Sequence, residues 1–118
     1  MTTTKFSGDK GERIACEYLL SKGYIILERN WRISNLEIDI ICSKEDFLIF
    51  VEVKYRKDAF FGDPVEFVTE QKMAYLATAA SRYIQSNAHK GPIRFDIIGI
   101  RPDRENHYKI RHLEDIVY

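Results

Sequence analysis

Residues 37–56 read EIDIICSKEDFLIFVEVKYR, and this stretch decides the fold. It holds two apolar runs, 36–42 and 47–55, on either side of the polar segment 43–46. Runs of this length, rich in isoleucine, valine and phenylalanine and bounded by polar residues, predict the two strands of a β-hairpin. The second run is apolar on both faces, which is typical of a strand in the middle of a sheet.

Charged residues interrupt both strands of this hairpin. Because strand side chains alternate between faces, Glu37 and Asp39 share one face, and Glu52 and Lys54 share one face. If residue 42 pairs with residue 47 across a four-residue turn, Glu37 lies opposite Glu52 and Asp39 lies opposite Phe50, diagonal to Glu52. The four polar groups then project from one face, with roughly 5–8 Å between their Cβ atoms.

Three carboxylates this close together repel one another and stay ionised only if positive charge lies among them. Lys54 supplies one charge, and a divalent cation supplies two. Carboxylate oxygens suit Mg²⁺ or Mn²⁺, and a lysine beside the metal can activate a water or stabilise charge on a phosphate. The pattern therefore favours metal-assisted phosphodiester hydrolysis. The structural alternative is a cross-strand ion network that pairs Glu37 with Lys54 and Asp39 with an arginine.

The rest of the chain supplies helices and strands around this hairpin. A helix is expected from Ser7 or Asp9 to about Lys22, with Glu12 on or beside its inward stripe. Thr69 is expected to cap a second helix after a loop at 57–68. Further strands are expected at 24–31, 93–101 and 108–112. The order αβββαβ(β) predicts an α/β domain, with a mixed β-sheet and flanking helices.

Three single residue types carry smaller expectations. Asp96 lies in an apolar strand, so we expect it to have a structural partner such as an arginine. The three histidines show no ligand spacing and are expected at the surface. Cys16 and Cys42 lie far apart in apolar contexts and are expected to be reduced thiols in the core.

Composition limits the function classes. The 118 residues fit one domain, 1–118, in which 1–7 are expected to be flexible. Lys and Arg number 18, as do Asp and Glu, so the net charge is zero and does not suit a protein that coats nucleic acid by bulk charge. The zero net charge is compatible with a local basic patch that binds nucleic acid, and residues 29–32 and 54–57 are the candidates for one. No apolar run approaches the roughly 20 residues of a membrane span, and no signal region opens the chain, so a cytoplasmic protein without a membrane partner is expected.

Several motifs together carry a family resemblance. Asp39 followed by Glu52-Val53-Lys54 resembles the D…(D/E)xK signature of the PD-(D/E)xK, restriction-endonuclease-like nucleases. The wider set resembles the YraN-like family of small bacterial proteins over nearly the whole chain. That set consists of Gly11-Glu12-Arg13 with Ala15, Gly23-Tyr24, Arg29-Asn30, Glu37-Ile38-Asp39-Ile40-Ile41, Phe50-Val51-Glu52-Val53-Lys54, Arg56, Phe61-Gly62 and Arg94-Phe95-Asp96.

This family in turn resembles archaeal Holliday-junction resolvases, which share the nuclease core. The resemblance implies a restriction-endonuclease-like domain and a Mg²⁺- or Mn²⁺-dependent endonuclease that acts on DNA, with branched DNA as the resolvase substrate. It also implies a homodimer, since a symmetric junction needs two cuts. The implied catalytic residues are Glu12, Asp39, Glu52 and Lys54.

The implied metal ligands are Asp39, Glu52 and the main-chain carbonyl of Val53, with Glu12 and Glu37 as further candidates. Arg13 and Arg29 match basic positions of resolvases that bind backbone phosphate. The candidate basic patches and the start of the second helix add Arg32, Arg56 and Lys72 as nucleic-acid-binding candidates. Resolvases are usually basic, whereas this chain is neutral, which bears on the preference for branched DNA more than on metal binding. A non-catalytic nucleic-acid-binding or adaptor module on the same fold is the alternative function.

Overall fold

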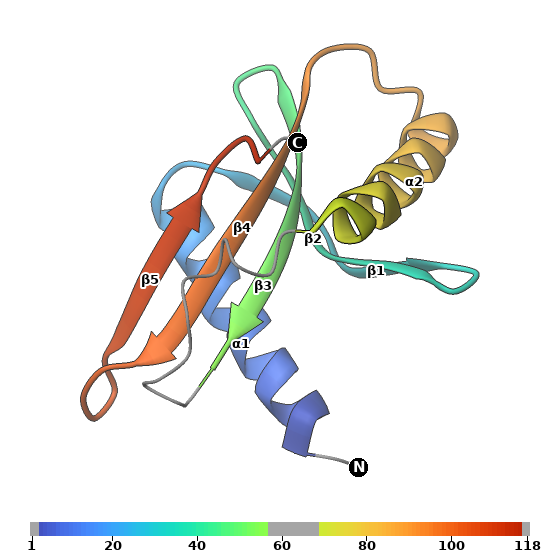
Figure 1. Cartoon of the computed structure of the whole chain (residues 1–118). Helices are drawn as coiled ribbons and strands as arrows, with labels where there is room; N and C mark the ends of the chain where they lie inside the picture. Colours follow the sequence, from blue (N-terminus) through green and yellow to red (C-terminus); the bar gives the residue numbers. More distant parts are fainter. Residues whose placement is uncertain (1–2, 57–68, 117–118) are drawn as a thin grey trace.

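The computed structural model describes residues 3–56 and 69–116, which form one curved sheet with two helices (Figure 1). The predicted order of elements is confirmed, including the last strand. The elements are α1 (Thr3–Ser21), β1 (Ile25–Ile33), β2 (Leu36–Lys44), β3 (Phe47–Tyr55), α2 (Glu70–Asn87), β4 (Ile93–Pro102) and β5 (Tyr108–Leu113). The loop expected at 57–68 lies outside the described residues.

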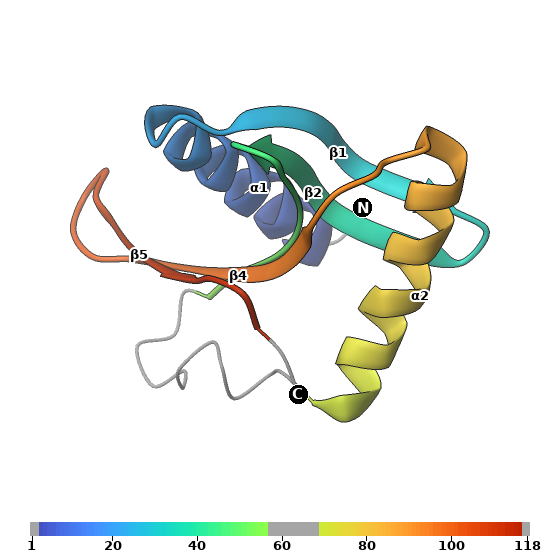
Figure 2. The same cartoon turned by 90° about the horizontal axis from the view of Figure 1, so that it is seen from above.

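The sheet has the strand order β1-β2-β3-β4-β5, so β3 is central as its two apolar faces predicted. Strands β1, β2 and β3 form an antiparallel meander, β4 runs parallel to β3, and β5 is antiparallel to β4. Parallel neighbours need a crossover connection, and α2 belongs to it. Figure 2 shows α1 and α2 on opposite sides of the curved sheet.

Each helix buries its own set of apolar side chains against the sheet. The α1-side core contains Ile14, Ala15, Cys16, Leu19, Tyr24, Ile40, Cys42, Ile49, Val51, Tyr55, Ile98 and Ile100. The α2-side core contains Ile38, Ile41, Leu48, Phe50, Ala79, Ala80 and Tyr83. Both cysteines are buried free thiols, as expected.

The register of the central hairpin differs from the prediction by two residues. Ser43 pairs with Leu48 and Lys44 pairs with Phe47, which leaves a two-residue turn instead of four. Glu45 enters the left-handed region at φ 57, a conformation that glutamate seldom adopts. The residues at this turn therefore did not indicate a two-residue turn. The predicted pairings of Glu37 with Glu52 and of Asp39 with Phe50 are therefore wrong. A shift of two keeps each side chain on its face.

The start of α2 agrees with the prediction, and the start of α1 differs from it. Thr69 caps α2, and its Oγ1 accepts a hydrogen bond of 3.0 Å from the backbone N–H of Lys72, as expected. In contrast, α1 begins at Thr3, earlier than the predicted caps Ser7 and Asp9. A residue that favours caps permits a helix to begin there, but it does not end a helix that arrives from upstream. Within 3–56 and 69–116, no helix is long and apolar enough to cross a membrane.

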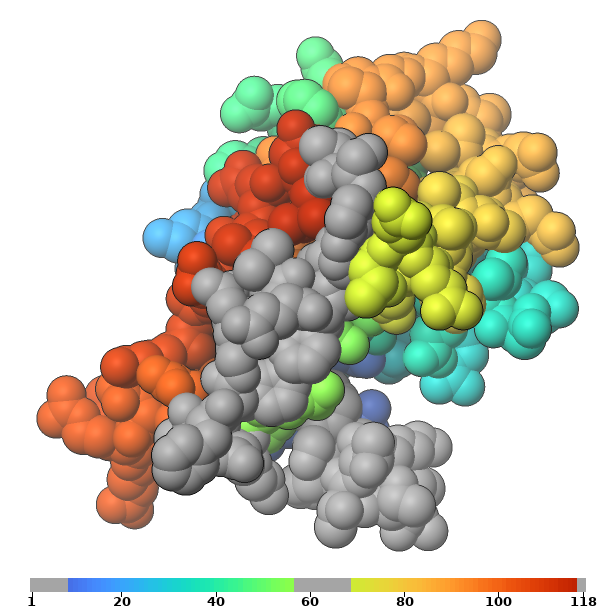
Figure 3. Space-filling model, in the orientation of Figure 1, coloured from blue at the N-terminus to red at the C-terminus, as the bar shows by residue number. Residues whose placement is uncertain are grey.

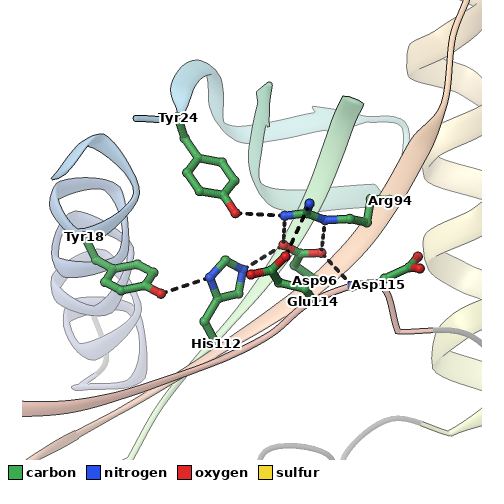
Figure 4. Close-up of polar contacts among 7 residues, drawn as sticks. All are labelled: Tyr18, Tyr24, Arg94, Asp96, His112, Glu114 and Asp115. Carbon is green, nitrogen blue, oxygen red and sulfur yellow. Dashed lines mark hydrogen bonds and ion pairs between the residues drawn. The ribbon is translucent and has the colours of Figure 1, made fainter. Parts of the chain in front are cut away.

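A buried polar network joins β4 and β5 to the end of α1 (Figure 4). Arg94 donates from Nε and Nη2 to the two carboxylate oxygens of Asp96, each at 2.9 Å, which confirms the expected arginine partner. His112 Nε2 lies 2.7 Å from Asp96 Oδ2, and its Nδ1 lies 3.1 Å from the Tyr18 hydroxyl. The expectation of a surface position is wrong for His112, because the edge strand β5 turns this residue inward onto a buried carboxylate.

Candidate functional site

The candidate site lies where β2 and β3 separate. Their pairing ends at Ile40 and Val51, so Asp39 is the first residue of β2 beyond the paired region. The carboxylate of Asp39 occupies the place of the missing ladder partner, because its Oδ2 accepts a hydrogen bond of 2.8 Å from the Val53 N–H. The aspartate is thus fixed beside the strand that carries Glu52 and Lys54.

Glu52 is a buried acid on the central strand, with 8% of its surface exposed. Its Oε2 lies 2.6 Å from the ammonium of Lys72 and 3.6 Å from that of Lys54. Lys54 comes from the same strand. Lys72 comes from the first turn of α2, and the start of this helix is the yellow-green patch on the face seen in Figure 3. Two lysines from different elements therefore converge on one carboxylate.

Glu12 reaches the site from α1. It is 6% exposed, and its Oε1 has no hydrogen-bond partner among the described residues. The residue before it, Gly11, explains how α1 approaches so closely, since an added Cβ there would lie 2.8 Å from Tyr55 Cβ. Burying a carboxylate oxygen without a hydrogen-bond partner lowers the stability of the fold. Glu12 is therefore a candidate for a functional role at this position.

These elements enclose a small hollow. A cavity of about 100 Å³ is lined by Glu12, Asp39, Val53, Tyr55 and Arg56. It is polar and large enough for a hydrated ion or a few waters. The structure thus brings together, around the split between β2 and β3, the four predicted catalytic residues and the basic candidates Arg56 and Lys72.

Burial shifts the pKa values of the acids and of one lysine at the site. Burial, the charge of Glu52 and a hydrogen bond to Glu52 raise the pKa of Asp39 to about 8, although the Val53 N–H acts in the opposite direction. Burial also raises the pKa of Glu12, against the opposing charge of Arg29. Burial lowers the pKa of Lys72, but the contact with Glu52 outweighs it and the net change is upward. Without a bound metal ion, Asp39 therefore retains its proton near neutral pH.

Asp39→Asn is expected to stabilise the metal-free protein as the pH rises. The folded-state pKa of Asp39 lies above its ordinary value of 3.8, so its contribution to stability is complete below about pH 4 and is lost as the pH rises through about 8. The amide imitates the protonated acid and can still accept from the Val53 N–H. The variant should gain about 2 kcal/mol in unfolding free energy at about pH 9, and less at about pH 5.

Urea unfolding at the two pH values measures this gain. A variant that is less stable than the wild type at both would contradict it and support an ion network that needs the charge of Asp39.

The donor set fits Mg²⁺ or Mn²⁺. Among the described residues, no three His, Cys, Asp or Glu side chains are grouped closely enough to form a complete metal cage. Mg²⁺ does not require one, since it is commonly held by one or two carboxylates and keeps several of its waters. Asp39 and Glu52 are such a pair, and Glu12, whose Oε1 has no partner among the described residues, lines the same cavity as Asp39.

The other predicted metal-binding and nucleic-acid-binding residues lie around the edge of the candidate site. Glu37 pairs with Arg32 at 2.8 Å, with 44% and 67% of their side chains exposed, and its charge helps to raise the pKa of the buried Glu12. Arg29 is exposed but close enough to lower the pKa of Glu12, and Arg13 is exposed on α1. The sequence marks Lys72 as a nucleic-acid-binding candidate at the start of the second helix, but its contact with Glu52 could not be predicted, because no sequence spacing relates the start of α2 to β3.

Comparison with known proteins gives one consistent result. The sequence profile of the Uncharacterised protein family UPF0102 matches residues 11–100. A UPF0102 protein of Flavobacterium psychrophilum is 45% identical over 111 residues, which are 94% of this chain and 92% of that protein. One of Clostridioides difficile is 50% identical over 97 residues, 81% of this chain and 85% of that protein. The matched region contains Glu12, Asp39, Glu52 and Lys54, and the YraN-like resemblance is confirmed: the chain belongs to the UPF0102 family.

Proposed function

We propose that this protein is a Mg²⁺- or Mn²⁺-dependent endonuclease that acts on DNA and has a restriction-endonuclease-like core. The observation that carries the proposal is the geometry where β2 and β3 separate: Asp39 is fixed to β3 by the Val53 N–H at 2.8 Å, and the buried Glu52 lies beside it with the ammonium of Lys54 at 3.6 Å. A purely structural network has no need of two acids buried side by side. Metal-dependent hydrolysis uses such a pair, which loses its protons when the metal binds.

The topology supports the same proposal. A helix precedes an antiparallel meander, and a helical crossover leads to a strand parallel to β3. This arrangement places Glu12 and Lys72 on opposite sides of the sheet, from which both reach the split between β2 and β3. The resemblance to resolvases implies a catalytic role for Glu12, together with Asp39, Glu52 and Lys54.

Each residue has a chemical task in this proposal. Asp39, Glu52 and the main-chain carbonyl of Val53 would hold the metal. A bound divalent cation supplies positive charge that stabilises the phosphorane-like transition state. Glu12 Oε1 is a free acceptor for the proton of the attacking water, directly or through a second water. The ammonium of Lys54 orients that water and stabilises charge on the phosphate, while Arg29, Arg56 and Lys72 surround the site with positive charge for the DNA backbone.

A cleavage panel in low salt with Mn²⁺ tests the proposal. It compares four-way junction, flap, linear duplex and single-stranded DNA, for the wild type and for Asp39→Asn, which removes the charge but keeps the shape. Metal-dependent product that disappears in the variant supports the nuclease and identifies its preferred substrate. If a folded wild type cleaves none of the four, the alternative of a non-catalytic nucleic-acid-binding module replaces it, and gel-shift titration with the same DNAs then identifies the ligand.

A further inference from the structure

Two ammonium groups neutralise Glu52, and they are held differently. The Lys72 contact is the shorter, 2.6 Å against 3.6 Å for Lys54. Lys54 is two residues from Glu52 on a rigid central strand. Lys72 arrives from another element, at the start of α2, so it can leave without any change in the sheet.

The surroundings of Lys72 hold it near the site without fixing it there. Its ammonium lies 5.1 Å from the ring centre of Tyr75, one turn further along α2, a favourable cation–π distance. The Tyr75 hydroxyl accepts a hydrogen bond of 2.8 Å from the Glu37 N–H, so the ring is anchored to β2. An open hollow of about 380 Å³, lined by Thr69, Gln71, Lys72 and Tyr75, lies beside it. A released ammonium therefore has a solvated position within reach.

We propose that Lys72 is a displaceable counter-cation, which neutralises Glu52 in the metal-free protein and is expelled when a divalent cation binds. This inference rests on the proposed function, because it assumes that Glu52 is a metal ligand. The same carboxylate oxygen, Oε2, cannot keep a 2.6 Å contact with an ammonium and also face a divalent cation without strong repulsion between the two positive charges. Lys72 thus competes with the metal and lowers its apparent affinity.

The contact also explains why a buried acid can persist on the central strand without metal. Glu52 is almost fully buried, and an unpaired charge there would be costly. Lys72 supplies the charge in the resting state and yields the position when a stronger cation arrives. After release, its ammonium remains beside the site, where the phosphate of a bound substrate is its natural partner.

Mn²⁺ affinity, measured by calorimetry and by electron paramagnetic resonance of free Mn²⁺ on the intact chain, tests the inference. Lys72→Met removes the charge and keeps much of the side-chain volume, so we expect it to bind Mn²⁺ about tenfold more tightly than the wild type. Lys72→Arg keeps the charge and should stay near the wild type. Lys90→Met makes the same charge change at an exposed residue just beyond the other end of α2, and should leave the affinity unchanged.

The Lys72→Met variant must match the wild type in circular dichroism and melting temperature. If it then binds Mn²⁺ equally or more weakly than the wild type, the inference about Lys72 is wrong, and the proposed metal site is unaffected. If neither protein binds Mn²⁺, the proposed metal site fails and the inference fails with it. Binding that appears only in Lys72→Met would support the inference in its strongest form. None of these readouts depends on DNA cleavage.

Discussion

Lys54→Met is expected to reduce Mn²⁺-dependent cleavage by about 10²- to 10³-fold while the protein stays folded, the range typical of a lost proton-transfer or charge-stabilising group. Lys54 Nζ lies 3.6 Å from Glu52 Oε2, so the change removes a cation from the site and not a ligand. Mn²⁺ affinity should therefore be maintained or rise. Single-turnover cleavage, together with calorimetry on the same preparation, separates the two effects.

Lys90→Met is the matched control, with the same side-chain change far along the chain at an exposed position. It should cleave at the wild-type rate. If Lys54→Met keeps full activity, or loses activity only in step with Mn²⁺ affinity, Lys54 has no part in the chemical step.

Asp96→Asn is expected to lower the unfolding free energy by about 3–5 kcal/mol, because it leaves a charge without its partner in the interior. Asp96 has no exposed side-chain surface, and Arg94 has 13%. The carboxylate accepts from Arg94, from the backbone N–H of Asp115 at 3.0 Å, and contacts His112 at 2.7 Å. Burial raises the pKa of Asp96, but His112, Arg94 and the Asp115 N–H outweigh it and hold the pKa below its usual range.

The pH dependence of this contribution has the opposite sign to that of Asp39. Because the folded-state pKa of Asp96 is depressed, its stabilisation is present above about pH 4 and is lost as the pH falls through the folded-state value. Glu37→Gln makes the same acid-to-amide change in an exposed ion pair with Arg32, and should cost less than about 1 kcal/mol. Equal shifts of the two variants in a guanidinium unfolding titration would show that the Asp96 network contributes no more than a surface pair.

Much of the fold follows from local patterns. The two-sided apolar run 47–55 predicted the central strand, and Thr69 predicted the start of α2, because burial on two faces and an N-cap are properties of neighbouring residues. The hairpin register could not be predicted the same way. It depends on Glu45 in the left-handed region, which the surrounding structure stabilises against the ordinary preference of glutamate.

For the candidate site, too, the sequence identifies single residues but not the contacts between them. Asp39, Glu52 and Lys54 stand out as charges within apolar strands, so sequence alone singles them out. Their geometry does not follow, since Asp39 meets β3 through the Val53 N–H and not through a cross-strand pair. The Lys72–Glu52 contact and the burial of His112 both join segments distant in the sequence, which only the packed chain brings together.

A calorimetric Mn²⁺ titration of the wild type beside Asp39→Asn tests the central claim most directly. The claim is that the coupled acids between β2 and β3 form a metal site. The account predicts saturable binding to the wild type, with a proton released as Asp39 ionises, and loss of that binding in a folded Asp39→Asn protein. Equal Mn²⁺ binding by both proteins, or none by either, would contradict it.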